Sequence, residues 1–348
     1  MKILIDICHP AHVHFYKNFI WEMEKRGHII KVTSRKKDVT SDLLNYYKIN
    51  HKVISFNLGN LLHLSIETFH RWQRLLKIIK KFKPDIITDV GGAFIAFPSK
   101  VCNAKSIVFT DSEFVPINKF ITYPFVEKIL TPKCFIKDLG KHHIKYNGYH
   151  ELAYLHPEYF TPNSDILDLL EIRKKQPYFI LRFVSWQASH DVLQSGFSID
   201  WKLKIIHELE KYGQVFISSE NPVPNKMKHY LIKIPPYKML DALYYADLFI
   251  GDGATMATES ALLGTPAIYS SSLVGTMGNF KELMDKYGLV YSYRSPDKAL
   301  KKALEILDKS DYKAIWMIKK KKLFEDKINV TKFMIEFFEN YLDSVNML

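Results

Sequence analysis

Three histidines lie close together in the sequence, directly after the first apolar run of the chain, Ile3–Ile7. His9, His12 and His14 fall where a strand should turn into a helix. Imidazoles titrate near neutral pH, so His14 or His12 is a candidate general base. Helix capping or packing would also account for one or two of these rings. The spacing His-x-x-His-x-His could suggest a metal site, but no carboxylate or cysteine nearby completes the set of ligands. We therefore predict no metal here.

A second polar cluster follows a later apolar run and contains Asp111 and Glu113, in the segment Phe-Thr-Asp-Ser-Glu. Ligands of α/β sheets bind beyond the carboxyl ends of the strands, so two carboxylates at this position favour the wall of a site. We predict that one of them orients the histidine base. The competing interpretation is that Asp111 simply caps the segment that follows.

The second half of the chain offers groups that could hold an anion. In the segment Arg-Phe-Val-Ser-Trp-Gln-Ala-Ser-His-Asp, small residues would let backbone amides approach a phosphate. This segment, together with one residue after the next strand, supplies the candidates Arg182, Ser185, Trp186, Ser189, His190 and Ser219. The alternative for Trp186 is a core position, and a buried Arg182 would need a partner.

A stronger anion signal comes from a turn of small residues between an apolar run and a helix. Exposed amides and the helix dipole at such a turn suit a diphosphate. Glu259 falls about one turn into the helix, where a carboxylate could accept hydrogen bonds from ribose. An ordinary turn with Asp252 as a cap is the other interpretation. The candidate residues, including a second turn that would close the same pocket, are Gly251, Asp252, Gly253, Ala254, Thr255, Glu259, Gly275, Thr276 and Met277.

Short β-branched runs alternate with longer amphipathic ones and would position these loops. Continuous apolar strands between helices predict parallel sheets covered on both faces. The predicted strands are Lys2–Ile7, His28–Thr33, Val53–Phe56, Asp85–Val90, Ser106–Thr110 and Lys128–Pro132, then Tyr178–Val184, Val215–Ser218, Leu231–Ile234, Leu248–Ile250, Ala267–Tyr269 and Leu289–Tyr291. The main predicted helices are His12–Arg26, Ser65–Phe82, Trp201–Tyr212, Thr255–Leu263, Pro296–Leu307, Tyr312–Phe324 and Thr331–Leu342.

The alternation pauses between about Tyr146 and Gln176, which predicts two domains in the 348 residues. We expect an N-terminal domain over 1–160, a C-terminal domain over 161–330, and a last helix over 331–348 that packs back on the first. The net charge of +12 lies entirely in residues 1–150, which hold 24 basic and 12 acidic residues, whereas 151–348 hold 25 of each. This asymmetry predicts different partners for the two halves.

The composition narrows the class of protein. Hydrophobic residues make up 47% and charged residues 25% of the chain, which excludes disordered and collagen-like sequences. The three cysteines form no CxxC pair, as expected in a reducing compartment. No apolar run is long enough to span a membrane, and the first residues do not form a signal peptide. We therefore expect a cytoplasmic protein.

The turn motif resembles that of the non-hydrolysing UDP-sugar 2-epimerases, siblings of the GT-B glycosyltransferases. Their pattern is Asp-Ser-Gly-Gly-x-Gln-Glu-Glu-Ala, followed by Leu-Gly-x-Pro. Its first Asp falls on Asp252, its last Glu on Glu259, and Leu-Gly-x-Pro on Leu263 to Pro266. The Gln and the first Glu are replaced by Ala257 and Thr258. The Arg-Pro-Glu that epimerases carry after the first strand is also missing.

The whole chain is more similar to the family called domain of unknown function 354. The matching segments are DICHPAHVHFYKNFIWEMEKRGH, RKKDVT, FTDSE, NGYHELAYLHP, RFVSWQASHD, GDGATMATESALLGTP and GTMGNF. This resemblance implies a GT-B-type α/β fold, with two Rossmann-like parallel-sheet domains facing across a cleft. The implied activity is sugar transfer from a nucleotide donor.

The resulting hypothesis is a metal-independent GT-B glycosyltransferase that needs no cofactor and uses a UDP-sugar as donor substrate. The neutral half would bind the donor. The basic half would bind the acceptor, for which a lipid-linked saccharide at the membrane surface would explain the charge. Basic and aromatic residues in the segment from His70 to Lys83 suit an interfacial helix, and the alternative is core packing with a lysine-rich outer face. The alternatives are a 2-epimerase and a nucleic-acid-binding protein, and no nucleic-acid recognition motif is present.

Overall fold

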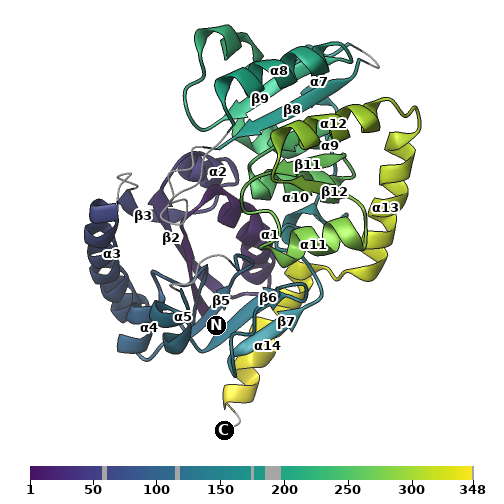
Figure 1. Ribbon diagram of the computed structural model, residues 1–348. Coiled ribbons are helices and arrows are strands. Elements are labelled where there is room, and N and C mark those ends of the chain that lie inside the picture. The colour runs from purple at the N-terminus through teal and green to yellow at the C-terminus, as the bar shows by residue number, and fades with distance from the viewer. Residues whose placement is uncertain (57–60, 114–117, 174–175, 185–196, 347–348) are drawn as a thin grey trace. The chain divides into compact units, whose positions relative to one another are not determined.

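The computed structural model describes residues 1–56, 61–113, 118–173, 176–184 and 197–346. The chain forms two compact units (Figure 1). Unit 1 comprises Met1–Tyr159 and Ile328–Leu348, and unit 2 comprises Phe160–Lys327. Both units contain a parallel sheet flanked by helices, which confirms the predicted Rossmann-like fold. The predicted cleft between the domains stays a prediction.

Unit 1 is built on a seven-stranded parallel sheet with the order β3-β2-β1-β4-β5-β6-β7. Its central strands are continuous apolar runs, as parallel strands buried on both faces require. The edge strand β7 was not predicted from the sequence, because two basic residues interrupt its apolar pattern. The strands are β1 (Lys2–Ile7), β2 (Ile29–Lys36), β3 (His51–Phe56), β4 (Ile86–Val90), β5 (Lys105–Phe109), β6 (Lys128–Pro132) and β7 (His143–Tyr146).

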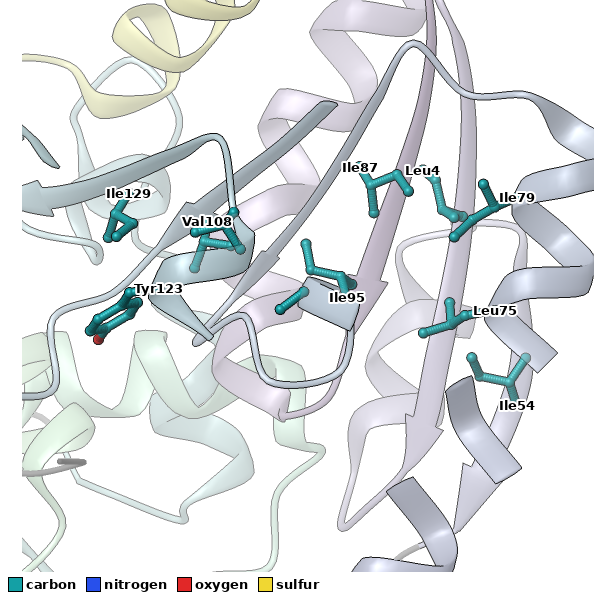
Figure 2. Packing of buried hydrophobic residues seen from close by; sticks show 11 residues of the cluster. Leu4, Ile54, Leu75, Ile79, Ile87, Ile95, Val108, Tyr123 and Ile129 are labelled. Atoms are coloured by element: carbon teal, nitrogen blue, oxygen red, sulfur yellow. The ribbon is translucent and has the colours of Figure 1, made fainter. Parts of the chain in front are cut away.

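Alternate residues of these strands face opposite sides of the sheet, and each side has its own set of helices. On one side, Leu4, Ile87 and Val108 pack against side chains from α3, α4 and η1, and Figure 2 shows this cluster. On the other side, Phe109 packs against Phe15 and Phe338. The helices of the first side are α3 (Leu61–Phe82), α4 (Ala96–Val101), α5 (Asn118–Ile121) and the 3₁₀ turn η1 (Tyr123–Phe125), and those of the second are α1 (Pro10–Lys25), α6 (Leu152–Leu155) and α14 (Val330–Asn346), with α2 (Thr40–Tyr46) beside α1.

The last helix, α14, belongs to the core of unit 1. Thr331 Oγ1 donates a 2.7 Å hydrogen bond to the carbonyl of Ala153, and the Phe338 ring lies 4.9 Å from that of Phe19. Gly148 is required at this junction, because a Cβ there would lie 2.5 Å from Cγ2 of Val330. The return of the chain is therefore a packed part of unit 1.

Unit 2 contains a five-stranded parallel sheet with the order β12-β11-β10-β8-β9. The predicted strand Leu231–Ile234 is wrong: only an isolated bridge joins Leu231 to Ile217, and Pro235 and Pro236 lack the N–H groups that would extend it. The strands are β8 (Tyr178–Phe183), β9 (Gln214–Ser219), β10 (Leu248–Gly251), β11 (Ala267–Ser270) and β12 (Val290–Tyr293). The helices are α7 (Asp165–Leu169), α8 (Ile199–Glu210), η2 (Asn225–Tyr230), η3 (Pro236–Lys238), α9 (Met239–Tyr245), α10 (Ala254–Leu263), α11 (Gly278–Asp285), α12 (Pro296–Leu307) and α13 (Tyr312–Asp326).

Candidate functional site

Each sheet has one point where the strand order reverses, and ligands of such folds bind there, beyond the carboxyl ends of the strands. In unit 1 this point lies between β1 and β4. In unit 2 it lies between β8 and β10. Most of the candidate residues from the sequence fall at the carboxyl ends of these strands or their neighbours.

The three histidines of unit 1 have different surroundings. His9 is the N-cap of α1, where its Nδ1 accepts a 3.2 Å hydrogen bond from the N–H of Ala11. His12 Nδ1 lies 3.4 Å from the donating N–H of Cys8. His14 is buried, with its Nδ1 3.5 Å from the Tyr47 hydroxyl. The capping interpretation therefore holds for His9.

The sequence predicted that His12 or His14 titrates near neutral pH. The surroundings of both imidazoles oppose this prediction. Burial lowers the pKa of each imidazole to about 3. Neighbouring basic side chains reinforce the shift, chiefly His150 for His12 and Lys17 for His14. Both rings are consequently neutral at physiological pH and weak as proton acceptors.

The two carboxylates after β5 have partners other than these histidines. Asp111 Oδ2 lies 3.5 Å from Nδ1 of His150, and Asp111 Oδ1 accepts a hydrogen bond from Ser112. Glu113 is buried, and its Oε1 accepts a 3.2 Å hydrogen bond from the N–H of Ile136. Asp111 is thus placed to orient an imidazole, but that imidazole belongs to His150.

His150 was missed in the sequence, although it stands in the turn segment Asn-Gly-Tyr-His after β7. Its ring is buried against Phe15, with centroids 4.7 Å apart. Burial lowers the pKa of His150, and the charge of Asp111 opposes this shift. Within the described residues, its Nε2 has no hydrogen-bond partner. A buried nitrogen of this kind is costly unless something completes its hydrogen bonding.

A buried network of charges lies at the same edge of the sheet, and the sequence analysis did not find it. Arg71, on α3, donates to both carboxylate oxygens of Asp6, and neither side chain is exposed. Cys8 Sγ lies 3.3 Å from Nη2 of Arg71, and burial raises the pKa of this thiol. Leu75 and Ile79, four and eight residues after Arg71, belong to the buried core cluster. That spacing was the signal that this arginine faces inward.

Asp89, at the end of β4, adds a second carboxylate to this network. It is the register partner of Asp6 on the neighbouring strand and is buried. Burial, and then the charge of Asp6, raises the pKa of Asp89 well above its usual range. Burial beside a second carboxylate therefore favours the protonated form of Asp89.

In unit 2, the turn after β10 packs directly against β8. A Cβ on Gly251 would lie 2.7 Å from Cβ of Arg182, and one on Gly253 would lie 2.9 Å from its Cγ. Asp252 is buried and accepts a 2.9 Å hydrogen bond from the N–H of Val184. The carboxylate thereby ties the turn to the segment after β8. The N-cap position of α10 itself is taken by the next residue, Gly253.

The N-terminus of α10 is built from small residues. Its N-cap residue is Gly253, and the first turn begins with Ala254 and Thr255. These amides and the helix dipole form a positive end beside the guanidinium of Arg182, which donates to Ser218 Oγ at 2.8 Å and pairs with Glu220. The turn has the geometry that the small residues predicted.

The remaining candidates divide into described and undescribed residues. Glu259 is buried on the second turn of α10. Ser219 Oγ donates to the carbonyl of Asn221, and Thr276 Oγ1 donates to that of Leu273. Gly275 has a φ of +92°, and Met277 is the N-cap of α11. Ser185, Trp186, Ser189 and His190 lie outside the described residues.

The described residues contain neither a candidate metal-binding cluster nor a candidate membrane-spanning helix. No group of three or more His, Cys, Asp or Glu side chains there could hold a metal ion. No helix in that part of the chain is long and apolar enough to cross a membrane.

Comparison with known families decides where the chain belongs. The model of a family described as a protein of unknown function, DUF354, matches residues 1–342. The chain belongs to this family. An uncharacterised protein of Methanocaldococcus jannaschii is 24% identical to it over 311 residues, which cover 84% of this chain and 88% of the relative.

Solved structures share the fold of this DUF354 protein at low sequence identity. A UDP-GlcNAc 2-epimerase from Neisseria meningitidis, bound to UDP-GlcNAc, gives a TM-score of 0.72 at 12% identity and covers 98% of this chain and 100% of its own. The spinosyn rhamnosyltransferase SpnG, with spinosyn aglycone, gives 0.61 at 10% identity, over 97% and 100%. The glycosyltransferase VinC, with dTDP, gives 0.61 at 9% identity, over 97% and 99%. The predicted resemblance to glycosyltransferases and epimerases is confirmed for the fold.

Proposed function

We propose that this DUF354 protein is a glycosyltransferase. It moves a sugar from a nucleoside-diphosphate donor, a UDP-sugar, to an acceptor in the synthesis of cell-surface polysaccharide or glycoconjugate. Unit 2 binds the donor, and unit 1, which is basic, binds the acceptor. The proposed acceptor is a lipid-linked saccharide. The observation that carries the proposal is the N-terminus of α10, which begins at a glycine and lies beside Arg182 at the reversal point of its sheet.

In this proposal the diphosphate of the donor rests on the amides of Gly253–Thr255. The packing of Gly251 and Gly253 against β8 supports it, because such close approach exposes backbone rather than side chains to the ligand. Arg182 neutralises the leaving diphosphate, and Glu259 holds the ribose. The loop with Gly275, Thr276 and Met277 closes the pocket, and the further donor-binding candidates are Ser219, Ser185, Trp186, Ser189 and His190.

The chemistry needs one proton acceptor in unit 1. The acceptor oxygen forms a bond to the anomeric carbon, the bond from that carbon to the diphosphate breaks with its electron pair, and the hydroxyl proton passes to the base. The sequence candidates for this base were His14 and His12, with Asp111 or Glu113 to orient the imidazole. Of the imidazoles, His150 is the one paired with Asp111, as a positioned base requires. We therefore add His150 to His12 and His14.

The second candidate function is 2-epimerisation of a UDP-sugar. It is favoured by the TM-score of 0.72 to an epimerase, against 0.61 to the transferases SpnG and VinC. Against it stand Ala257 and Thr258, which replace the motif's Gln and first Glu. Epimerisation at C2 must break and remake the C2–H bond, whereas transfer leaves that bond intact.

This chemical difference decides the experiment. The full chain is screened by thermal shift against nucleoside diphosphates and sugar nucleotides, since a bound ligand raises Tm by mass action. We expect stabilisation by UDP and UDP-sugars, and a loss of this effect in Glu259→Ala but not in Glu305→Ala, an exposed glutamate of α12. No stabilisation by any nucleotide would overturn the proposal.

The sugar nucleotide that stabilises the protein is then incubated with the full chain in D₂O. One reaction contains an extract of lipid-linked saccharides and the other does not. Release of UDP that depends on the extract supports transfer. Deuterium at C2 without such release would instead establish the epimerase.

A further inference from the structure

Unit 1 exposes large apolar side chains on one group of neighbouring helices. Phe120 is 72% exposed and Phe69 57% exposed. Isolated exposed apolar residues are ordinary, but a concentration of them marks an interaction surface. We call this surface the α3–η1 face, and its exposed apolar residues are Ile66, Phe69, Phe97, Val101, Phe120, Ile121 and Phe125.

These side chains come from helices that cover the same side of the sheet. The inner sides of α3, α4 and η1 pack on one core cluster, with Leu75, Ile95 and Tyr123 pointing into it (Figure 2). On α3, the positions four apart that include Arg71 and Leu75 face inward, so Phe69 lies on the opposite flank. The rings of Trp72 and Phe97 lie 4.8 Å apart and join α3 to α4. The apolar residues therefore share one outer surface.

The charges on this face have a single sign. The one acidic residue of α3, Glu67, is buried in a bidentate pair with Arg35. Among the described side chains of α3, α4, α5 and η1, the exposed charged residues are all basic, and Arg74, Lys77, Lys80, Lys81 and Lys100 are among them. The partner of this face must offer an apolar region next to negative charge.

We infer that the α3–η1 face docks on the surface of an anionic lipid bilayer. Phe69, Phe97 and Phe120 would enter the boundary between headgroups and acyl chains, while the lysines contact the headgroups. Basic residues near such a surface and apolar area removed from water both favour the bound state. The inference goes beyond the proposed function, because it concerns unit 1 and needs no nucleotide. Docking would also bring the protein to the membrane that holds a lipid-linked acceptor.

The test uses the full chain and flotation with vesicles of phosphatidylcholine, with or without one quarter phosphatidylglycerol. We expect flotation with the anionic vesicles only, weakened by high salt. The double variant Phe69→Ser/Phe120→Ser and the variant Lys77→Glu/Lys80→Glu should each reduce the bound fraction at least about tenfold. The matched control is Ile318→Ser on α13, whose side chain is 71% exposed, and it should float like the wild type.

Thermal stabilisation by UDP is measured on each variant, so that failure of the nucleotide proposal is recorded separately. Absence of wild-type flotation, or equal flotation of the double variant and the control, would overturn the inference. Wild-type self-association that Phe69→Ser/Phe120→Ser abolishes, without vesicle binding, would also overturn it and assign the face to a second copy.

Discussion

Arg71 and Asp6 form a bidentate ion pair that is completely buried, with Nη2 to Oδ1 at 2.6 Å and Nε to Oδ2 at 3.3 Å. The pair joins α3 to β1 at the carboxyl edge of the sheet. Thr33 Oγ1 also donates to Asp6, at 2.6 Å, so the carboxylate is held from two sides. Arg71, for whose helix the sequence left both an interfacial role and core packing open, is thus part of the core of unit 1.

Removal of one partner of this pair should be costly. Arg71→Met leaves the Asp6 carboxylate buried without its counter-charge, and we expect a loss of about 3–5 kcal/mol in the free energy of unfolding. Urea denaturation measures it. Arg26→Gln breaks an exposed pair with Glu339 in the same unit and should cost less than about 1 kcal/mol. Equal losses in the two variants would show that the buried pair contributes no more than the exposed one.

Asp89 makes the stability depend on pH in a definite direction. Its pKa in the folded protein is raised above the value of 3.8 that is usual for the unfolded chain, so folding favours the protonated form. The contribution of Asp89 is fully present below pH 3.8 and is lost as the pH rises toward the folded pKa. Asp89→Asn should therefore stabilise the protein near neutral pH, and this gain should shrink on acidification. Unfolding measured from pH 4 to pH 8 checks it, and a gain independent of pH would contradict it.

The pairing of Asp111 with His150 predicts an effect on the rate of transfer. His150→Gln should lower kcat by a factor of about 10²–10⁴ without changing donor affinity, as loss of a general base does. Asp111→Asn should lower the apparent pKa of the kcat profile, because the charge of Asp111 raises that of His150. His156→Gln is the control, since that imidazole also lies near a carboxylate, 3.9 Å from Glu158. If His12→Ala or His14→Ala alone reproduced the rate loss, the base would be that residue.

Arg182 should matter for the diphosphate and not for the nucleoside. We expect Arg182→Gln to weaken UDP binding about tenfold, the equivalent of one charge-assisted hydrogen bond, and to leave uridine binding unchanged. Calorimetric titration of both ligands measures the difference. Lys204→Gln removes an exposed cation elsewhere in unit 2 and should change neither affinity. Equal weakening of UDP and uridine would assign Arg182 to the architecture of the turn.

Metal-independence can be tested directly. If the amides of α10 and Arg182 neutralise the leaving group, EDTA should leave the initial rate of transfer unchanged. Activity that disappears with EDTA and returns with magnesium or manganese would refute this prediction.

The fold could be predicted from the sequence because the hydrophobic pattern of each strand or helix lies within its own short segment. Lys2–Ile7 and Lys128–Pro132 were predicted with the observed bounds. The edge strand His143–Tyr146 has no such pattern, since its outer side faces solvent. Leu231–Ile234 has the pattern but lacks the hydrogen-bond donors beyond it.

The site of unit 1 was less predictable, because partners distant in sequence decide it. His12 and His14 look like bases in a list of residues, yet burial sets their pKa, and burial depends on rings such as Tyr154 that pack on them later in the chain. Asp111 meets His150 through the placement of β5 beside β6 and β7. In unit 2 the turn, its glycines and the helix are contiguous, and there the spacing alone predicted the geometry.

The return of α14 to unit 1 has a consequence for biosynthesis. Unit 2 is one continuous segment, Phe160–Lys327, whereas unit 1 needs residues from Ile328 onward to cover Phe19 and Phe109. On the ribosome, the domain whose synthesis starts first must therefore be the last to complete its core. The nascent N-terminal sheet carries an open apolar side throughout the translation of the inserted domain, and chaperones that hold exposed apolar surface should bind the chain during that interval.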